Sequence, residues 1–97
     1  MDLIKKIGLP ATLELLAEEC AELAQAALKL SRIIRKENPT PVTINAAKEK
    51  LAEEMADVEI IFKQMDVLKD VEEQKSKWQA YKLERLETRL LEVKNYA

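Results

Sequence analysis

Histidine is absent from this sequence, and cysteine, glycine, proline and aromatic residues are scarce. Without histidine, neither serine–histidine or cysteine–histidine catalysis nor the usual zinc sites are available. The single cysteine, Cys20, excludes an internal disulfide and is typical of a reducing compartment. One glycine and three prolines permit few tight turns, which argues against an all-β fold. Any catalysis therefore depends on carboxylates, Lys, Arg, Tyr or a metal held by oxygen.

The sequence also has no excess of one charge and no long apolar run. Sixteen basic and eighteen acidic residues give a net charge of −2, too small to attract nucleic acid or an anionic membrane nonspecifically. No run approaches the roughly 18 apolar residues of a spanning helix, and residues 1–10 lack the apolar stretch of a signal peptide. Four aromatic residues are too few for a base-stacking surface. We expect a cytoplasmic protein that binds neither nucleic acid nor membrane.

Helix-forming residues dominate what is present. Ala, Glu, Lys, Leu and Arg account for 56 of the 97 residues, a composition typical of long helices. The chain length predicts a single all-α domain over residues 1–97, with residues 1–8 as an N-terminal arm. Three long helices are expected, over residues 10–36, 44–68 and about 71–93.

Several residues mark the expected helix ends. Pro10 suits the first turn of the first helix, where its missing N–H costs nothing. Asn38, Pro39 and Pro41 interrupt the chain, because proline restricts both itself and the residue before it. Either Thr40 or Thr43 can cap the second helix. Asp70, followed by Glu73, resembles a capping box for the third helix.

Apolar residues recur in steps of three and four along the helices, which predicts one packing stripe on each. The first stripe comprises Leu13, Leu16, Cys20, Leu23, Ala27, Leu30 and Ile34; the second comprises Ile44, Ala47, Leu51, Met55, Val58, Phe62 and Met65. The short break predicts that these two helices form an antiparallel hairpin beside a third long helix. Further apolar residues exceed what three helices can cover, so we expect two hairpins to form a four-helix-bundle-type dimer core. These residues are Leu15, Leu28, Ile33, Ile60 and Ile61.

Two groups of acidic residues stand on the predicted hairpin. The first helix carries Glu18, Glu19 and Glu22, and the second carries Glu54 and Asp57, with no basic residue within 15–28 or 51–62. Acids three or four residues apart on a helix are neighbours and repel each other. Grouped carboxylates without cations of their own are what a hard divalent ion requires.

The helical period places both acidic groups beside the apolar stripes. At about 100° per residue, Glu19 and Glu22 share a sector with Leu15, Ala26 and Ile33, and Glu54 and Asp57 lie beside Ile61. In an antiparallel pair these flanks meet along one edge, so four carboxylates should border one groove. Mg²⁺ fits such a ligand set best, with Mn²⁺ as an alternative. The competing interpretation is that the acids are solvent-facing partners of lysines on neighbouring helices.

The segments Glu18-Glu19-x-x-Glu22 and Glu54-x-x-Asp57 resemble the EExxE…ExxD signature of MazG-like nucleotide pyrophosphohydrolases, within the all-α NTP pyrophosphatase superfamily. The resemblance covers roughly residues 8–92. It implies cleavage of a nucleoside triphosphate between its α- and β-phosphates, giving a monophosphate and pyrophosphate. It also implies Mg²⁺ held by Glu19, Glu22, Glu54 and Asp57, with Glu18 or Glu19 orienting the attacking water. Enzymes of this family work as dimers or tetramers.

A triphosphate also needs cationic side chains. Lys82, Arg85 and Arg89 are spaced by three and four residues on the third helix, and Lys29 lies one to two turns beyond Glu22. The alternative for the third-helix residues is a solvated basic stripe balanced by neighbouring glutamates.

Two other functions remain open at this stage. One is a non-catalytic helical dimerisation or adaptor module whose acids form salt bridges. The other is a narrower pyrophosphatase specific for dUTP or dCTP. Metal dependence separates the first from an enzyme, and a substrate panel separates the second.

Overall fold

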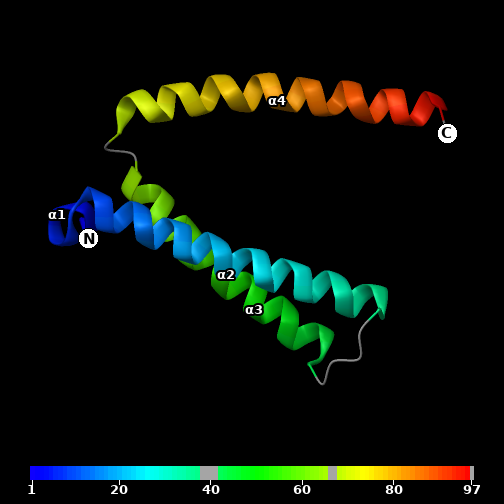
Figure 1. The fold of residues 1–97 in the computed structure, drawn as a ribbon, viewed down its shortest axis with the longest axis horizontal. Coiled ribbons are helices and arrows are strands. Elements are labelled where there is room, and N and C mark those ends of the chain that lie inside the picture. Colours follow the sequence, from blue (N-terminus) through cyan, green and yellow to red (C-terminus); the bar gives the residue numbers. More distant parts are fainter. Residues whose placement is uncertain (38–41, 66–67, 97) are drawn as a thin grey trace. The chain divides into compact units, whose positions relative to one another are not determined.

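The computed structural model describes residues 1–37, 42–65 and 68–96. In chain order the helices are α1 (Leu3–Ile7), α2 (Leu9–Arg35), α3 (Ile44–Gln64) and α4 (Lys69–Tyr96) (Figure 1). These ranges contain no strand, so the predicted all-α class is confirmed. The helices belong to two compact units, one of residues 1–64 and one of residues 65–97. No helix in the described ranges is both long enough and apolar enough to cross a membrane.

Local backbone features set the ends of α2. Gly8, with a φ of 89°, separates α1 from α2, and Pro10 lies in the first turn as predicted. The carbonyl of Gly8 accepts hydrogen bonds from Thr12 N–H (3.1 Å) and from the buried Thr12 hydroxyl (2.8 Å). At the other end Lys36 adopts the left-handed conformation, and its N–H donates to Ile33 O (3.2 Å). The observed helix thus differs from the predicted one by one residue at each end.

The beginning of α3 follows the prediction, whereas its end and the beginning of α4 do not. Thr43 Oγ1 accepts the Ala46 N–H at 3.1 Å, which confirms the cap at Thr43. The expected break at Asn38, Pro39 and Pro41 and the alternative cap at Thr40 lie outside the described residues. The end of α3, predicted at Leu68, comes at Gln64 instead.

The predicted cap at Asp70 is wrong. The Leu68 carbonyl already accepts the Glu72 N–H at 3.0 Å, so α4 begins at Lys69. Asp70 therefore lies inside the first turn, where a negative charge still favours the positive end of the helix dipole. Glu73 accordingly has no capping-box position.

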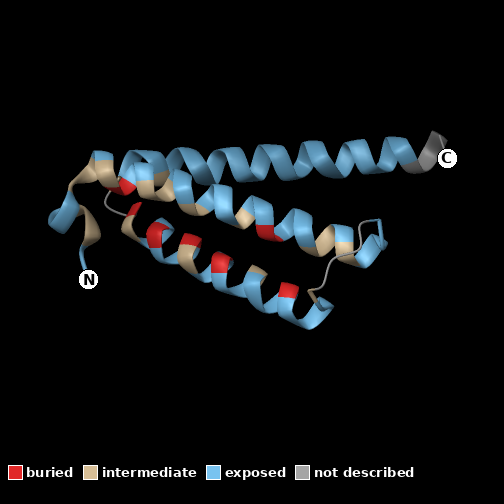
Figure 2. Ribbon diagram, turned by 60° about the horizontal axis from the view of Figure 1, so that its bottom comes forward, coloured by how far each residue is buried: buried red, intermediate tan, exposed pale blue. Residues whose placement is uncertain are grey.

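Within the first unit, α2 and α3 lie side by side and run in opposite directions (Figures 1 and 2). The short α1 packs against α2. The Leu3 N–H donates to Gln64 Oε1 at 2.9 Å, which joins α1 to the end of α3. Small side chains at Ala26 and Ala47 are buried and permit close approach of the two long helices. The other buried residues of this unit are Thr12, Glu54, Val58 and Ile61.

The buried faces of α2 and α3 are not the predicted stripes. On both helices the buried face is rotated by roughly 60° toward the acidic residues, given about 100° per residue. Ala47, Val58 and Met65 are buried as predicted, but much of both stripes is exposed. Each helix carries apolar residues on more than one face, and a single pairing covers only one of them. The exposed stripe members include Leu13, Cys20, Ala27, Ile34, Ile44, Met55 and Phe62.

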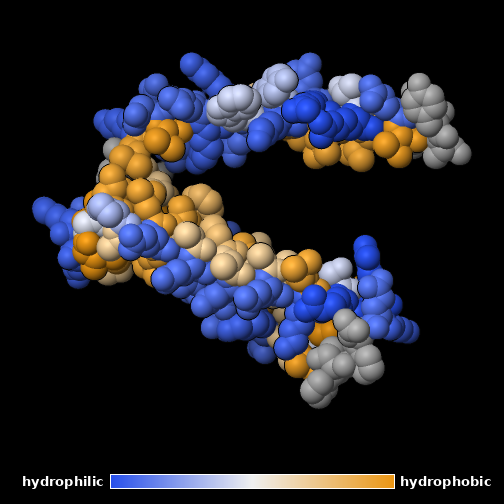
Figure 3. Space-filling view, in the orientation of Figure 1, coloured by the Kyte–Doolittle hydropathy of each residue, from blue (hydrophilic) through white to orange (hydrophobic). Residues whose placement is uncertain are grey.

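In the second unit α4 buries no residue of 69–93 (Figure 2). A band of apolar side chains follows one side of the helix (Figure 3), and all of its members are more than half exposed. They are Leu83, Leu86, Leu90, Leu91 and Val93. Earlier on this helix, Trp78 and Tyr81 stack edge to face with ring centroids 5.9 Å apart.

Candidate metal centre

Carboxylates from two helices meet at the α2/α3 interface. Glu19 and Glu22 of α2 and Glu54 of α3 each offer an oxygen, and these oxygens lie within 4.8 Å of one another. Glu53, Glu54 and Asp57 form a second such group, which shares Glu54 with the first. All four residues for which metal ligation was predicted thus lie in one cluster, because Glu54 belongs to both groups.

Two oxygens in this cluster are buried without a hydrogen-bond partner. They are Glu19 Oε2 and Glu54 Oε2. Glu54 is only 2% exposed, so its carboxylate has lost most contact with water. Buried polar atoms in folded proteins are nearly always paired, because an unpaired group carries its full desolvation cost. A hard cation between the helices would provide both oxygens with a partner, so these residues fit a divalent metal ion.

The pKa of Glu19 reflects the burial and the negative charges of the cluster. Its pKa is raised, first by desolvation and then by the neighbouring charges of Glu22, Asp57 and Glu54, with a further increase from a hydrogen bond with Glu22. Three acidic groups therefore act on one carboxyl from both helices. A positive ion bound here would oppose the repulsion from each of these three carboxylates.

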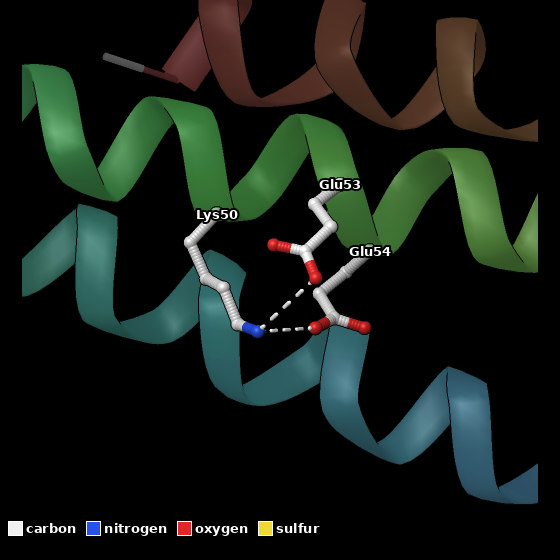
Figure 4. Close-up of polar contacts among 3 residues, drawn as sticks. All are labelled: Lys50, Glu53 and Glu54. Carbon is white, nitrogen blue, oxygen red and sulfur yellow. Dashed lines mark ion pairs between the residues drawn. The ribbon is translucent and has the colours of Figure 1, made fainter.

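One cation of the protein already contacts this cluster. Lys50 Nζ lies 2.9 Å from Glu54 Oε1 and 3.7 Å from Glu53 Oε1 (Figure 4). The hydrogen bond to Glu54, with the charges of Glu53 and Glu54, raises the pKa of Lys50. Lys50 lies immediately before residues 51–62, which contain no basic residue, and the sequence interpretation missed it. The i,i+4 spacing from Lys50 to Glu54 was the signal that could have identified it.

A pocket of about 350 Å³ opens beside the carboxylates. Lys29 of α2 and Lys50 of α3 both line it, so two cationic side chains border the same space as two of the acids. The predicted position of Lys29 near Glu22 is therefore observed. The full lining is Glu22, Gln25, Ala26, Lys29, Lys50 and Glu54.

The other predicted site residues, Glu18 and the basic residues of α4, belong to neither acidic group. Glu18 is exposed and contributes to neither acidic group. Lys82 places its Nζ 5.9 Å from the centroid of the Trp78 ring, in a cation–π arrangement. Arg85 and Arg89 line a shallow depression along α4 itself. These three residues belong to the second unit, and their contact with phosphate remains a prediction.

Each chemical property of the centre comes from side chains of α2 and α3. Together they provide clustered oxygen ligands, two of them unsatisfied, and two lysines beside a pocket large enough for several phosphate groups. Such a set can bind a hard divalent cation together with an anion.

No model of a known protein family matches the chain, and no curated protein or solved structure matches it either.

Proposed function

We propose that this chain is a Mg²⁺-dependent nucleoside triphosphate pyrophosphohydrolase of the MazG-like kind, acting on the cytoplasmic nucleotide pool. It would convert an NTP or dNTP into the monophosphate and pyrophosphate. The EExxE…ExxD resemblance supplies the reaction. The observation that carries the proposal is the pair of buried, unpartnered oxygens of Glu19 and Glu54.

In this proposal the chain's own residues position the reactants. Glu19, Glu22, Glu54 and Asp57 hold Mg²⁺, or alternatively Mn²⁺. The bound ion supplies Lewis-acid catalysis and a more acidic water. Glu18 or Glu19 orients the attacking water, whose oxygen bonds to the α-phosphorus. The bond from that phosphorus to the bridging oxygen breaks, pyrophosphate leaves, and the water's proton passes to solvent.

The direct test is pyrophosphate release from a panel of eight NTPs and dNTPs, with Mg²⁺ and with EDTA. The double variant Glu54→Gln/Asp57→Asn should lose the metal-dependent release. Glu59→Gln is the matched control, because Glu59 is exposed on the same helix outside both acidic groups. Absence of release from every nucleotide, with no Mg²⁺-induced rise in Tm, would overturn the proposal. The ranking of substrates would show whether the enzyme is narrow, for dUTP or dCTP, or broad.

We also propose that two copies of the α2/α3 hairpin, each followed by α4 as a third long helix, form a four-helix dimer core or part of a tetramer. The observation behind this is the exposed apolar face of the pair, which includes Leu13, Ile34, Met55 and Phe62. Each of these side chains is more than two-fifths exposed. Covering them would remove a large apolar area from water. Light scattering at micromolar concentration tests the assembly, and a monomer mass would contradict it.

The second candidate function is a non-catalytic helical dimerisation module. It is favoured by the Lys50–Glu54 ion pair, since an internal cation already neutralises part of the acidic cluster. A ligand that binds only the folded state raises its Tm. The module should therefore melt at the same temperature with and without Mg²⁺, whereas the enzyme should be stabilised.

A further inference from the structure

Besides a longer contact with Glu53 at 3.7 Å, the ammonium group of Lys50 has two possible partners. One is Glu54, whose Oε1 it contacts at 2.9 Å. The other is the pocket of about 350 Å³ that it lines together with Lys29. The Lys50 side chain is 57% exposed, so its long aliphatic stem can turn without disturbing buried residues. The Glu54 side chain is 3% exposed and stays in the interface.

Glu54 and an anion in the pocket would compete for the ammonium group of Lys50. While the carboxylates lack another cation, Lys50 is the positive group that compensates the buried Glu54 carboxylate. A divalent ion among Glu19, Glu22 and Glu54 would satisfy that carboxylate more strongly than a single ammonium does. The same ion would repel the ammonium of Lys50 at close range. The pocket that Lys50 already lines is then a space open to its ammonium group.

We infer that Lys50 exchanges partners, leaving Glu54 when a divalent cation binds and joining Lys29 as a binding site for a linear phosphate chain. The inference rests on the proposed function, because it requires the metal at the carboxylates. The site would take a diphosphate or triphosphate chain, whether from a nucleotide or from inorganic polyphosphate. Lys50 thus becomes a binding residue that no spacing of acids indicated. The unpartnered, buried Glu54 Oε2 is the independent observation that a ligand belongs beside the pair.

Two binding measurements test the exchange without any turnover. The first titrates Mn²⁺ alone and follows the free ion by electron paramagnetic resonance. The second titrates inorganic tripolyphosphate by calorimetry in saturating Mg²⁺, with orthophosphate in parallel. The proteins are the wild type, Lys50→Met, Lys29→Met and Lys48→Met. Lys48 is the matched control, since it is exposed on α3 and does not line the pocket.

Lys50→Met should bind Mn²⁺ about two- to fivefold more tightly, because the ion no longer displaces a partly exposed ammonium. The same variant should bind tripolyphosphate about tenfold more weakly, because a charge-assisted contact is lost. Lys29→Met should weaken the binding of tripolyphosphate but not that of Mn²⁺, and Lys48→Met should change neither affinity. Orthophosphate should bind more weakly than tripolyphosphate, because it engages fewer cations.

Failure of the inference and failure of the proposed function give different results. No Mn²⁺ binding by the wild type would overturn both. Mn²⁺ binding with equal tripolyphosphate affinity in the wild type and Lys50→Met would overturn the exchange alone. Loss of both ligands in Lys50→Met would also overturn it, because a purely structural ion pair predicts that pattern. Lys50→Arg, which keeps the charge, should restore tripolyphosphate binding and so exclude misfolding as the cause.

Discussion

The α2/α3 pair buries a glutamate and leaves a phenylalanine half exposed, whereas α4 exposes every leucine and buries nothing between residues 69 and 93. Both regions have helical periodicity, so periodicity alone does not decide which face is buried. In the helix pair, the buried residues include the small Ala26 and Ala47 and one acid of the cluster, Glu54. Among the described residues of the second unit, α4 is the only α-helix, so no partner helix of that unit covers its apolar band. A buried charge without a full set of partners is costly, which supports the binding site proposed for the pair. An exposed apolar band such as that of α4 is typical of a surface that another molecule covers.

The largest expected effect is on the rate of pyrophosphate release, which should depend on an acid of the α2/α3 pair and not on an acid of α4. Glu54→Gln should lower the rate of pyrophosphate release by roughly 10²–10³-fold, the range for loss of one group that stabilises a transition state. Glu84→Gln, at an exposed acid of α4, should leave the rate unchanged. Steady-state kinetics at saturating Mg²⁺ measure both. Equal losses in the two variants would mean that the acids of α4 belong to the same centre.

Truncation of one apolar residue in each region should have unequal effects on stability. Ile61→Ala should lower the free energy of unfolding by about 2–4 kcal/mol, because Ile61 is 4% exposed and its loss leaves a cavity. Leu86→Ala should cost less than about 0.5 kcal/mol, because Leu86 is 52% exposed. Urea unfolding provides both values. A large, concentration-dependent cost for Leu86→Ala would show that a second copy covers α4 in solution.

The raised pKa of Glu19 predicts that its substitution raises the stability of the metal-free protein, whereas the substitutions above lower rate or stability. A carboxyl whose pKa is higher in the folded state stabilises the fold below the ordinary pKa of glutamate, and this stability is lost as the pH rises through the raised pKa. Above the raised pKa, the ionised form of Glu19 is therefore unfavourable without metal. Glu19→Gln should have a higher Tm than the wild type in EDTA and should lose the Mg²⁺-induced rise. Thermal melts in EDTA at about pH 4 and about pH 7 check the sign, since the difference should shrink in acid. A wild type that melts above Glu19→Gln at neutral pH in EDTA would contradict the assignment.

The smallest expected effect is on stability, when each of two lysines with similar ion pairs, Lys75 and Lys50, is replaced. Lys75 Nζ lies 2.7 Å from Glu72 Oε2 on α4, closer than Lys50 lies to Glu54. The Glu72 side chain is ten times more exposed than that of Glu54, 32% against 3%. Lys75→Met should therefore change the free energy of unfolding by less than about 0.5 kcal/mol. Lys50→Met should have the larger effect on the Tm in EDTA, and equal effects would show that burial of the acid does not matter.

Much of the secondary structure could be predicted from the sequence, but the choice of buried face could not. Pro10 and Thr43 indicated helix beginnings because their effects are local. The acids were expected to meet, since Glu19, Glu22, Glu54 and Asp57 share one rotational side of each predicted stripe. The burial of Glu54 in the contact, with Leu13 and Phe62 exposed, depends on how the two helices pack. Lys50 was missed because only residues 51–62 were searched for cations; its i,i+4 spacing to Glu54 indicated the ion pair, but not that Glu54 is buried.

The hydrogen bond from Leu3 to Gln64 joins residues that are 61 positions apart. It closes the first unit at the end where α2 begins and α3 finishes. Formation of such a contact requires both long helices to be present and paired, because only then do the two groups meet. The amide proton of Leu3 is therefore protected from exchange with solvent only while the whole helix pair is assembled. A single amide near the start of the chain thus reports on the integrity of the acidic centre.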